Sequence, residues 1–327
     1  MKKFLKYTAV VLLGLFLVLI LWGLLEPRLM IDYRPITAEI PNLPMEWEGK
    51  QIALLADIQI GMWLDNRATV RRIVNKLIEQ QPAAVLIAGD FIYEPTGEKT
   101  KEEAQEEMEL EDYREAMEQI QDVARLMDSL PRSGIPTYAV LGNHDYGLQW
   151  PTDVKLEQVP HLLKRALSQV GIVVLDNEAI ALTSAGQSIQ DSYPLYLVGI
   201  GSRYASNDKP LTALAGVPEE APRIVFMHNP DTFASITSGA APLALAAHTH
   251  GGQIRLPFFP AWSWMTVLKD DRVTADGWID NFGQPGNRLY VNRGIGFSRI
   301  PIRINCPPEV TLLTLRRAHL SVSQPPN

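Results

Sequence analysis

The chain of 327 residues has very little cysteine and little concentrated positive charge. Its single thiol, Cys306, excludes an internal disulfide, so no disulfide framework holds the fold. No basic tract stands out beyond the first few residues, and the net charge is −7. Nucleic-acid binding therefore has little electrostatic support, and we predict no nucleic-acid partner. Internal repeats are also absent, and the length suits a single large α/β domain with additional segments.

Charge is absent altogether from residues 7–25, YTAVVLLGLFLVLILWGLL. As a helix this run spans roughly 28 Å, about the thickness of the bilayer hydrocarbon. It lacks the polar face that a buried amphipathic helix shows. No small-x-small cleavage pattern follows it and no twin arginine precedes it. These absences favour an uncleaved transmembrane anchor over a removed signal peptide.

The charges on the two sides of this run predict its orientation. Three lysines precede it within residues 1–6, whereas only Glu26 and Arg28 follow it closely. The positive-inside rule places residues 1–6 in the cytoplasm and the rest of the chain outside. We therefore expect a single-pass membrane protein whose catalytic domain lies outside the cytoplasm.

The remainder of the chain divides into three parts. Residues 26–48 carry four prolines without a helical period, and we interpret them as a Pro-rich stalk. Residues 49–317 alternate apolar strand patterns with helical patterns and form the predicted catalytic domain. Residues 318–327 are expected to be a flexible tail.

Within the catalytic domain the periodicity predicts an α/β fold. Helices are expected at 69–80, 101–130 and 161–170. Strands are expected at 50–57, 83–90, 136–145, 223–230, 242–250, 288–294 and 309–316. Further strands are expected between 171 and 201, the middle ones antiparallel.

Five of these predicted strands end in polar side chains that can bind metal. In α/β sheets, sites gather where the carboxyl ends of strands meet loops, so we expect these side chains to converge. They are Asp57 with Gln59, Asp90, Asn143 with His144 and Asp145, His228, and His248 with His250.

These residue types suit a pair of divalent cations. The Asp90 carboxylate has two oxygens and can bridge two metals, and Asn143 offers a neutral carbonyl oxygen. Histidines together with carboxylates suit manganese, iron or zinc better than calcium. Two such ions about 3.5–4 Å apart stabilise the attacking and leaving oxygens of a phosphoester displacement and generate hydroxide near neutral pH.

Taken in order, D-x-[H/Q], GD, GNHD, H and H-x-H resemble the motifs of the calcineurin-like metallophosphoesterases. The longer segments HNPDTF, HTHGGQIRLPF and NRGIGFSRIPIRINCPPEVTLLTL are similar to the bacterial membrane-associated or exported branch. The resemblance covers residues 49–316. It implies a two-sheet α/β sandwich with outer helices.

The resemblance also implies a role for each site residue. Residues Asp57, Gln59, Asp90 and His250 would hold the first metal, and Asp90, Asn143, His228 and His248 the second. His144 would stabilise or protonate the leaving oxygen, with Asp145 orienting its ring.

The sequence departs from the family pattern at two positions. Gln59 stands where the family usually has histidine, and Ala247 replaces the glycine of the usual GHxH. Because glutamine offers an amide oxygen, we expect manganese at the first site, with zinc or iron as alternatives.

We expect a metal-dependent phosphodiesterase or phosphatase that acts on an envelope or lipid-linked phosphoester, with residues 7–25 in the membrane. Three alternatives remain open. They are a UDP-2,3-diacylglucosamine diphosphatase-like activity, which needs a cytoplasmic site, a phosphoprotein phosphatase, and a non-catalytic metal-stabilised envelope binding module.

Weaker signals lie near the predicted site. Arg203 and Arg293 follow strands, and we favour ion pairs over a substrate phosphate as their partners. The segment 257–265, PFFPAWSWM, is aromatic, and packing over the core is favoured over contact with lipid.

Overall fold

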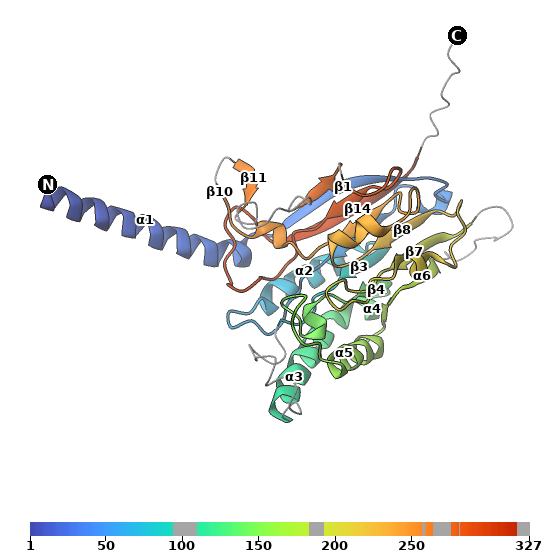
Figure 1. Cartoon of the computed structure of the whole chain (residues 1–327), viewed down its shortest axis with the longest axis horizontal. Coiled ribbons are helices and arrows are strands. Elements are labelled where there is room, and N and C mark those ends of the chain that lie inside the picture. The colour runs from blue at the N-terminus through green and yellow to red at the C-terminus, as the bar shows by residue number, and fades with distance from the viewer. Residues whose placement is uncertain (94–109, 183–192, 257–258, 264–275, 281, 319–327) are drawn as a thin grey trace, which may run out of the picture.

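The structure is a computed structural model of the chain that describes residues 1–93, 110–182, 193–256, 259–263, 276–280 and 282–318 (Figure 1). The start of the helix predicted at 101–130, the tail after residue 318 and residues 257, 258, 264 and 265 of the aromatic segment 257–265 lie outside these described residues.

One mixed sheet has the strand order β1-β14-β2-β3-β4-β5. Strands β2 to β5 are parallel to one another, β14 is antiparallel to β2, and β1 is parallel to β14. In sheet order the bounds are Asp32–Ile40, Glu309–Arg317, Gln51–Leu55, Ala84–Ala88, Thr137–Val140 and Ile172–Val174.

The other large sheet has the order β12-β13-β9-β8-β7-β6. Its four central strands are parallel, and both edge strands run antiparallel to their neighbours. The bounds are Gly277–Ile279, Leu289–Val291, Ala244–Ala246, Arg223–Phe226, Leu195–Gly199 and Glu178–Leu182. A small hairpin pairs β10 (Arg255–Leu256) with β11 (Phe259–Ser263).

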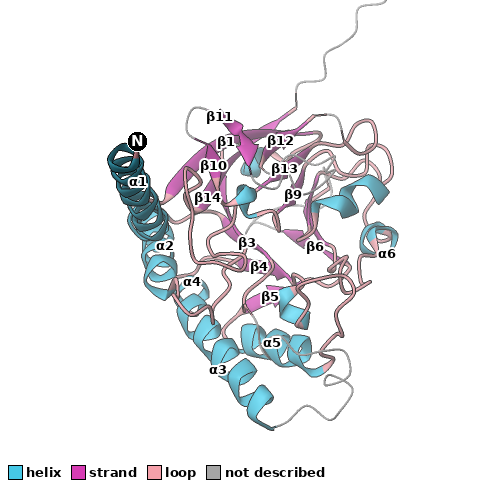
Figure 2. Cartoon of the chain, turned by 60° about the vertical axis from the view of Figure 1, so that its left-hand side comes forward, coloured by secondary structure: helices cyan, strands magenta, loops and turns pink. Residues whose placement is uncertain are grey.

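The two sheets pack face to face, and strand alternation decides which side chains lie between them. In β2, Ile52 and Leu54 belong to the apolar cluster that joins both sheets, whereas Ala53 and Leu55 face the helices. Helices α2 (Arg67–Gln80), α3 (Leu110–Met127), α4 (Ser129–Arg132) and α5 (Gln158–Gln169) cover this outer face, as Figure 2 shows. The predicted two-sheet α/β sandwich is therefore confirmed.

The second sheet carries its own outer layer. Helix α6 (Pro210–Leu214) and the 3-10 helix Pro230–Ser235 pack on its outer face. Three further 3-10 helices occur at Met45–Trp47, His144–Tyr146 and His250–Gly252, and the last two carry predicted site residues. The expected antiparallel arrangement in the middle of the chain holds for β6 but not for β5, which is parallel to β4.

Helix α1 (Lys2–Leu29) projects from the body of the molecule (Figure 1). Among the described residues it is the one helix long and apolar enough to cross a membrane, and a signal sequence near an N-terminus meets the same criterion. Its side chains are exposed over most of its length, and Gly23, Glu26 and Pro27 are buried at its carboxyl end. The helix therefore contacts the body only through its last turns.

The predicted stalk differs from the structure. Residues Asp32–Ile40 form strand β1, which pairs with β14 over its whole length. Proline is tolerated there because β1 is an edge strand, where one side of the backbone needs no partner. The side chains of Ala38, Leu43 and Trp47 are buried in the core between the sheets. Much of the region between α1 and β2 is thus part of the folded domain that contains both sheets.

Candidate metal centre

The predicted site residues lie just beyond the ends of five strands, where the two sheets face each other. Strands β2, β3 and β4 are parallel in one sheet, and β8 and β9 are parallel in the other, so their carboxyl ends meet at one edge of the sandwich. The structure therefore brings the predicted ligands together. They are Asp57 and Gln59 after β2, Asp90 after β3, Asn143 after β4, His228 after β8, and His248 and His250 after β9.

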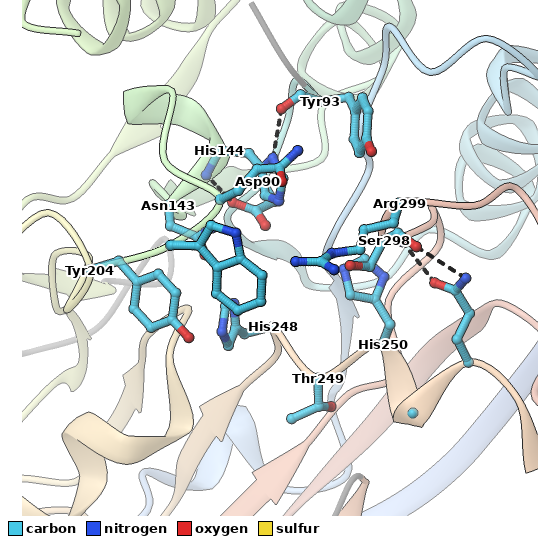
Figure 3. A pocket seen from close by; sticks show the side chains of 14 residues that line it. Asp90, Tyr93, Asn143, His144, Tyr204, His248, Thr249, His250, Ser298 and Arg299 are labelled. Carbon is cyan, nitrogen blue, oxygen red and sulfur yellow. Dashed lines mark hydrogen bonds between the residues drawn. The ribbon is translucent and has the colours of Figure 1, made fainter. Parts of the chain in front are cut away.

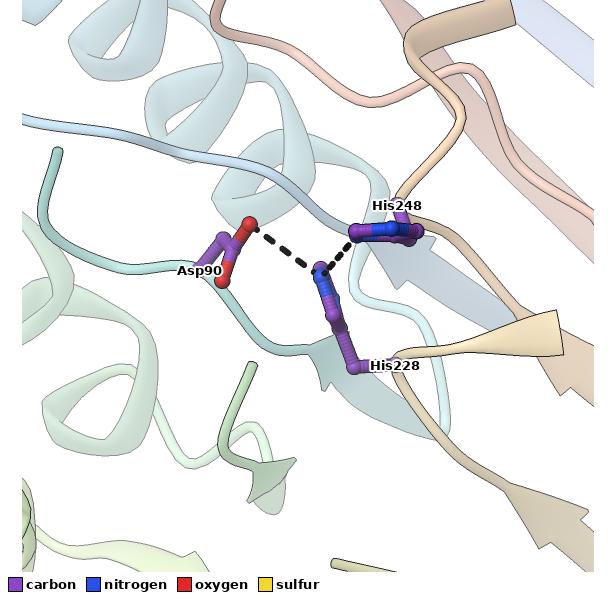
Figure 4. Close-up of side chains that lie close together, drawn as sticks. All are labelled: Asp90, His228 and His248. Atoms are coloured by element: carbon purple, nitrogen blue, oxygen red, sulfur yellow. Dashed lines mark hydrogen bonds and ion pairs between the residues drawn. The ribbon is translucent and has the colours of Figure 1, made fainter. Parts of the chain in front are cut away.

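One group of donors centres on His228 (Figure 4). Its Nε2 lies 3.1 Å from Asp90 Oδ2, 3.1 Å from His248 Nδ1 and 3.1 Å from Asn143 Oδ1. Its Nδ1 donates to the Ala88 carbonyl at 2.8 Å. That bond fixes the ring so that Nε2 faces the other donors, as expected for a histidine that binds metal.

A second group shares Asp90 and lies deeper in the protein. Its carboxylates and imidazole, from Asp57, Asp90 and His250, offer ligand atoms that all lie within 4.8 Å of one another. The amide of Gln59 lies beside them, with Nε2 3.5 Å from Asp90 Oδ2 and 3.4 Å from His250 Nε2. A half-turn of that amide would present Oε1 to the same two groups.

Several buried polar atoms of this deeper group have no hydrogen-bond partner. They are both carboxylate oxygens of Asp57, Oε1 of Gln59 and Nδ1 of His250. Buried polar groups in proteins are almost always paired, because an unpaired one costs about 1–3 kcal/mol. Lone pairs left free on carboxylate, amide and imidazole groups fit divalent cations, so the residues present suit a metal pair.

The backbone at these positions is also unusual. Twelve non-glycine residues in the described chain have positive φ, and five are predicted ligands, with φ of 47° at Asp57, 46° at Gln59, 55° at Asp90, 73° at His248 and 50° at His250. Such angles are strained for residues with a side chain and cluster at functional sites. By contrast Ala247, which replaces the usual glycine, is not among them.

Two glycines make room for the carboxylates. A Cβ at Gly142 would lie 2.1 Å from Asp90 Oδ1, and a Cβ at Gly294 would lie 2.2 Å from Asp57 Oδ2. At either position the carboxylate would have to move for any larger residue to fit. The glycine of the GNHD motif is thus required by its contact with Asp90.

Burial and neighbouring charges shift the pKa values of Asp57 and Asp90 in opposite directions. Complete burial raises the pKa of the Asp57 carboxyl to about 7. Burial acts in the same direction on Asp90, but the imidazoles of His228 and His144 outweigh it, and the pKa of Asp90 falls below its usual range. Asp90 is therefore the carboxylate best able to stay ionised between both donor groups.

The pKa values of the buried histidines His250 and His228 are also shifted in opposite directions. Burial lowers the pKa of His250 well below its usual value, and the Arg303 guanidinium adds to this effect. For His228 burial also acts downward, but the Asp90 carboxylate outweighs it and raises the pKa to about 9. Metal binding at His228 therefore has to displace a proton, whereas His250 has a free lone pair.

His144 lies at the rim of the centre, and its ring is oriented by Tyr93 rather than by Asp145. Its Nδ1 donates to the Tyr93 carbonyl at 2.6 Å, and the two rings stack with centroids 5.5 Å apart. The Asp145 carboxylate instead accepts from the backbone N–H groups of Asp90, Phe91, Ile92 and Gly142. Asp145 therefore joins two ligand-bearing loops and does not orient the ring as expected.

Arg303 was not singled out from the sequence, although it is the largest fully buried side chain. Its guanidinium donates to backbone carbonyls of His250, Arg293, Gly294, Gly296 and Cys306, which fixes the loop that carries His250. No local pattern signals this role, because the acceptors are backbone atoms. Nor does the sequence single out Tyr93, whose carbonyl holds His144.

The two arginines considered as phosphate ligands both form ion pairs. Arg293 is buried and contacts Glu309 at 2.7 Å, and Arg203 contacts Asp208 at 3.1 Å. This agrees with the favoured interpretation from the sequence.

A pocket of about 260 Å³ opens over the donor groups (Figure 3). It includes Asp90, Asn143, His144, His248 and His250, so the candidate centre is open to a ligand. The remaining lining residues are Tyr93, Gln149, Trp150, Tyr204, Thr249, Gly252, Gln253, Ser298 and Arg299.

Comparisons with known proteins agree with this geometry. The model of the calcineurin-like phosphoesterase family matches residues 50–252, more than half of the chain. Phosphodiesterase YaeI of Escherichia coli (strain K12) is 34% identical over 55% of this chain and 58% of its own length. The uncharacterized metallophosphoesterase YkuE of Bacillus subtilis (strain 168) is 25% identical over 89% of this chain and 87% of its own.

UDP-2,3-diacylglucosamine pyrophosphatase LpxG of Chlamydia muridarum is also similar, at 25% identity over 88% of this chain and 90% of its own length. The family match, the two-sheet sandwich and the donor groups at the strand ends all agree. The chain belongs to the calcineurin-like phosphoesterase family, whose members are metal-dependent phosphoester hydrolases.

Proposed function

We propose that this protein hydrolyses phosphoester or diphosphate bonds with a centre of two divalent cations. The observation that carries the proposal is the set of unpaired buried donors at Asp57, Gln59 and His250 beside the His228 group. Asp57, Gln59, Asp90 and His250 would hold one cation, and Asp90, Asn143, His228 and His248 the other. Such a pair supplies Lewis acidity to the phosphate and makes water a stronger nucleophile.

His144 is proposed to deliver a proton to the leaving oxygen. Because the Tyr93 carbonyl can only accept, Nδ1 of His144 carries hydrogen, and Nε2 is the nitrogen free to exchange a proton with substrate. His144 also lines the pocket together with Asp90, Asn143, His248 and His250. Its role is thus general acid catalysis by a ring that Tyr93 holds in place.

Manganese is the cation proposed for the first site. Two aspartates, one amide oxygen from Gln59 and one imidazole form an oxygen-rich set, and such sets favour harder ions. Zinc and iron are the alternatives, and activity measured after reloading with each ion separates them.

An envelope or lipid-linked phosphoester is the proposed substrate, with α1 as a single-pass anchor and the domain outside the cytoplasm. The lysines before residue 7 support this orientation. LpxG is named for cleaving UDP-2,3-diacylglucosamine, and such an activity is the second candidate here. A reporter that is active only outside the cytoplasm, fused after Arg316, distinguishes them, since a silent reporter would favour the second candidate.

The test of the proposed activity uses the full chain in detergent, stripped of metal and reloaded. Hydrolysis of bis-p-nitrophenyl phosphate, p-nitrophenyl phosphate and envelope diphosphates should return with manganese and stop again with chelator. Metal binding without hydrolysis of any of them would favour a binding module instead. Activity on phosphopeptides alone would favour a phosphoprotein phosphatase.

A further inference from the structure

The carboxyl end of α1 is held against the loop that leads into the pocket. The Arg303 N–H donates to the Gly23 carbonyl at 2.9 Å. A Cβ at Gly23 would lie 2.3 Å from Ile302 Cγ2, so the loop packs directly on the helix backbone. The loop therefore meets α1 at a residue of the uncharged run 7–25.

A buried carboxylate strengthens this contact. Glu26 is 2% exposed and accepts from the N–H groups of Asn305 and Cys306 at 2.9 and 2.7 Å. On the other side, Thr69 Oγ1 of α2 donates to the Pro27 carbonyl at 3.3 Å. With bonds to two separate parts of the domain, the last turns of α1 cannot rotate freely, which fixes the direction of the pocket relative to the helix axis.

Three residues along the chain separate this contact from the pocket wall. Arg299 lines the pocket, and three extended residues span at most about 11 Å. Between them Ile300 is 45% exposed. Figure 1 shows that α1 leaves the body at the end that carries β10, the strand that follows the His250 loop. The pocket wall at Arg299 is thus within about 11 Å of the contact with Gly23, which lies near the end of the uncharged run.

Arg299 has features expected of a residue that binds an anion. Its side chain points into the pocket (Figure 3), and its guanidinium lies 4.3 Å from the centroid of the Trp150 ring. No ion pair is found for it among the described residues, unlike Arg203 and Arg293. Its φ of 62° is a strained value, like those of the predicted ligands. A guanidinium positioned on an aromatic ring binds phosphate through a planar pair of donors.

We propose that the pocket opens at the membrane surface and receives the phosphate headgroup of a lipid that stays in the bilayer. Arg299, supported by Trp150, binds the headgroup phosphate, and Ile300 contacts the membrane interface. A volume of about 260 Å³ is small beside the usual 300–1,000 Å³ of ligand pockets, so the acyl chains remain outside. This inference rests on the proposed function and on α1 spanning the membrane.

The test places the full chain, loaded with manganese, in phosphatidylcholine nanodiscs with or without dioleoyl phosphatidic acid. Hydrolysis of bis-p-nitrophenyl phosphate and release of phosphate from the lipid are both measured. The membrane-held lipid should raise the apparent KM for bis-p-nitrophenyl phosphate at least about fivefold. Oleate, an anionic amphiphile without phosphate, should not raise it. Soluble dihexanoyl phosphatidic acid at the same total concentration should compete more weakly than the lipid in the bilayer.

Two variants with matched controls locate the effect. Arg299→Ala should weaken competition by the lipid about 10- to 100-fold, as expected for one charge-assisted contact, with metal content unchanged. Arg299→Lys should restore part of it. Ile300→Asp should lower the ratio of bilayer competition to soluble competition about fivefold. The controls are Arg132→Ala, an exposed arginine on α4, and Leu211→Asp, an exposed leucine on α6.

The outcomes separate the two levels of the proposal. Without hydrolysis of bis-p-nitrophenyl phosphate by the loaded protein, the proposed function itself fails. If hydrolysis occurs but the lipid competes no better than oleate, or Arg299→Ala behaves as Arg132→Ala does, the membrane-facing site is refuted. Equal competition by bilayer and soluble lipid would refute the delivery from the membrane.

Discussion

The buried polar clusters around Glu309 and around Asp57, both within the described residues, differ in how completely their atoms are paired. Around Glu309, the carboxylate accepts from Tyr290, Asn292, Arg293 and Thr311, so this cluster is internally satisfied. Around Asp57, both carboxylate oxygens, Oε1 of Gln59 and Nδ1 of His250 are buried without hydrogen-bond partners. Burial of charge alone therefore does not mark a site, whereas the candidate centre gathers several unpaired buried atoms of metal-binding residue types in one place.

The backbone sharpens the same contrast. The unpaired cluster contains the positive φ angles of Asp57, Gln59 and Asp90, whereas Tyr290, Asn292 and Glu309 have none. Backbone strain and buried atoms without hydrogen-bond partners both lower the stability of the fold. A bound ion offsets this cost, because these atoms then coordinate it. The cluster around Asp57 should thus respond to metal, and the cluster around Glu309 should not.

The largest effect is expected where the two donor groups share a ligand. Asp90→Ala removes the carboxylate common to both, so turnover of bis-p-nitrophenyl phosphate should fall by about 10⁴-fold or more and both metals should be lost. The assay measures turnover, and elemental analysis of the same samples measures the metal content. Asp128→Ala, which removes a carboxylate paired with Arg132, serves as the control. Metal content close to wild type in Asp90→Ala would exclude a shared ligand.

A smaller loss is expected at the rim, where His144 moves a proton but belongs to neither donor group. His144→Ala should lower turnover by roughly 10²–10⁴ while metal content stays near wild type. The exposed His161 supplies the matched control, His161→Ala. Equal loss of metal and activity in His144→Ala would show that His144 acts as a ligand.

Stability, rather than catalysis, should change in the paired cluster. Glu309→Ala removes the closest carboxylate partner of Arg293 Nε and leaves the buried hydroxyls of Tyr290 and Thr311 without this acceptor, whereas Asp32 and Asp276 still pair with Arg293. The free energy of unfolding should fall by about 3–5 kcal/mol, because each buried polar group left unpaired costs about 1–3 kcal/mol. Urea denaturation of metal-free and metal-loaded protein measures it. The folded fraction should still bind metal as wild type does, and a changed ratio of metal to folded protein would contradict the division between the clusters.

The smallest effect is expected at Gln59. Gln59→His replaces the amide with an imidazole. It should increase the affinity of the first site for zinc or iron relative to manganese by about tenfold, since imidazole suits those ions. Titrations of activity with each metal in one buffer measure the preference. Identical profiles for wild type and Gln59→His would mean that the side chain does not ligate.

The sequence was sufficient to predict the sandwich and the set of side chains that converge. The predicted ligands lie at or just beyond the ends of short apolar strands. Because parallel strands end at one edge of the sheet, this local pattern is enough to bring the ligands together in the fold. The assignment of Asp57 and His250 to one metal came instead from the resemblance to the family, since the strand-end pattern predicts only that the residues converge.

Other features depend on contacts between distant segments. Strand β1 pairs with β14 across more than half the chain, and its proline made it look like a stalk. The ring of His144 is held by the carbonyl of Tyr93, a group present in every residue, so no side-chain pattern predicts it. Arg299 is distinguished by its direction into the pocket and by the lack of an ion pair among the described residues, and both depend on the fold.

The most direct test of the account is a metal titration of the stripped full chain, followed by calorimetry and thermal unfolding. We expect wild type to bind two equivalents of manganese, with each site adding about 4 kcal/mol of stability at a free concentration 1,000 times its Kd and phosphoesterase activity returning in parallel. Binding of less than one equivalent, or hydrolysis unchanged by stripping, would contradict the claim that the unpaired donors hold a catalytic metal pair.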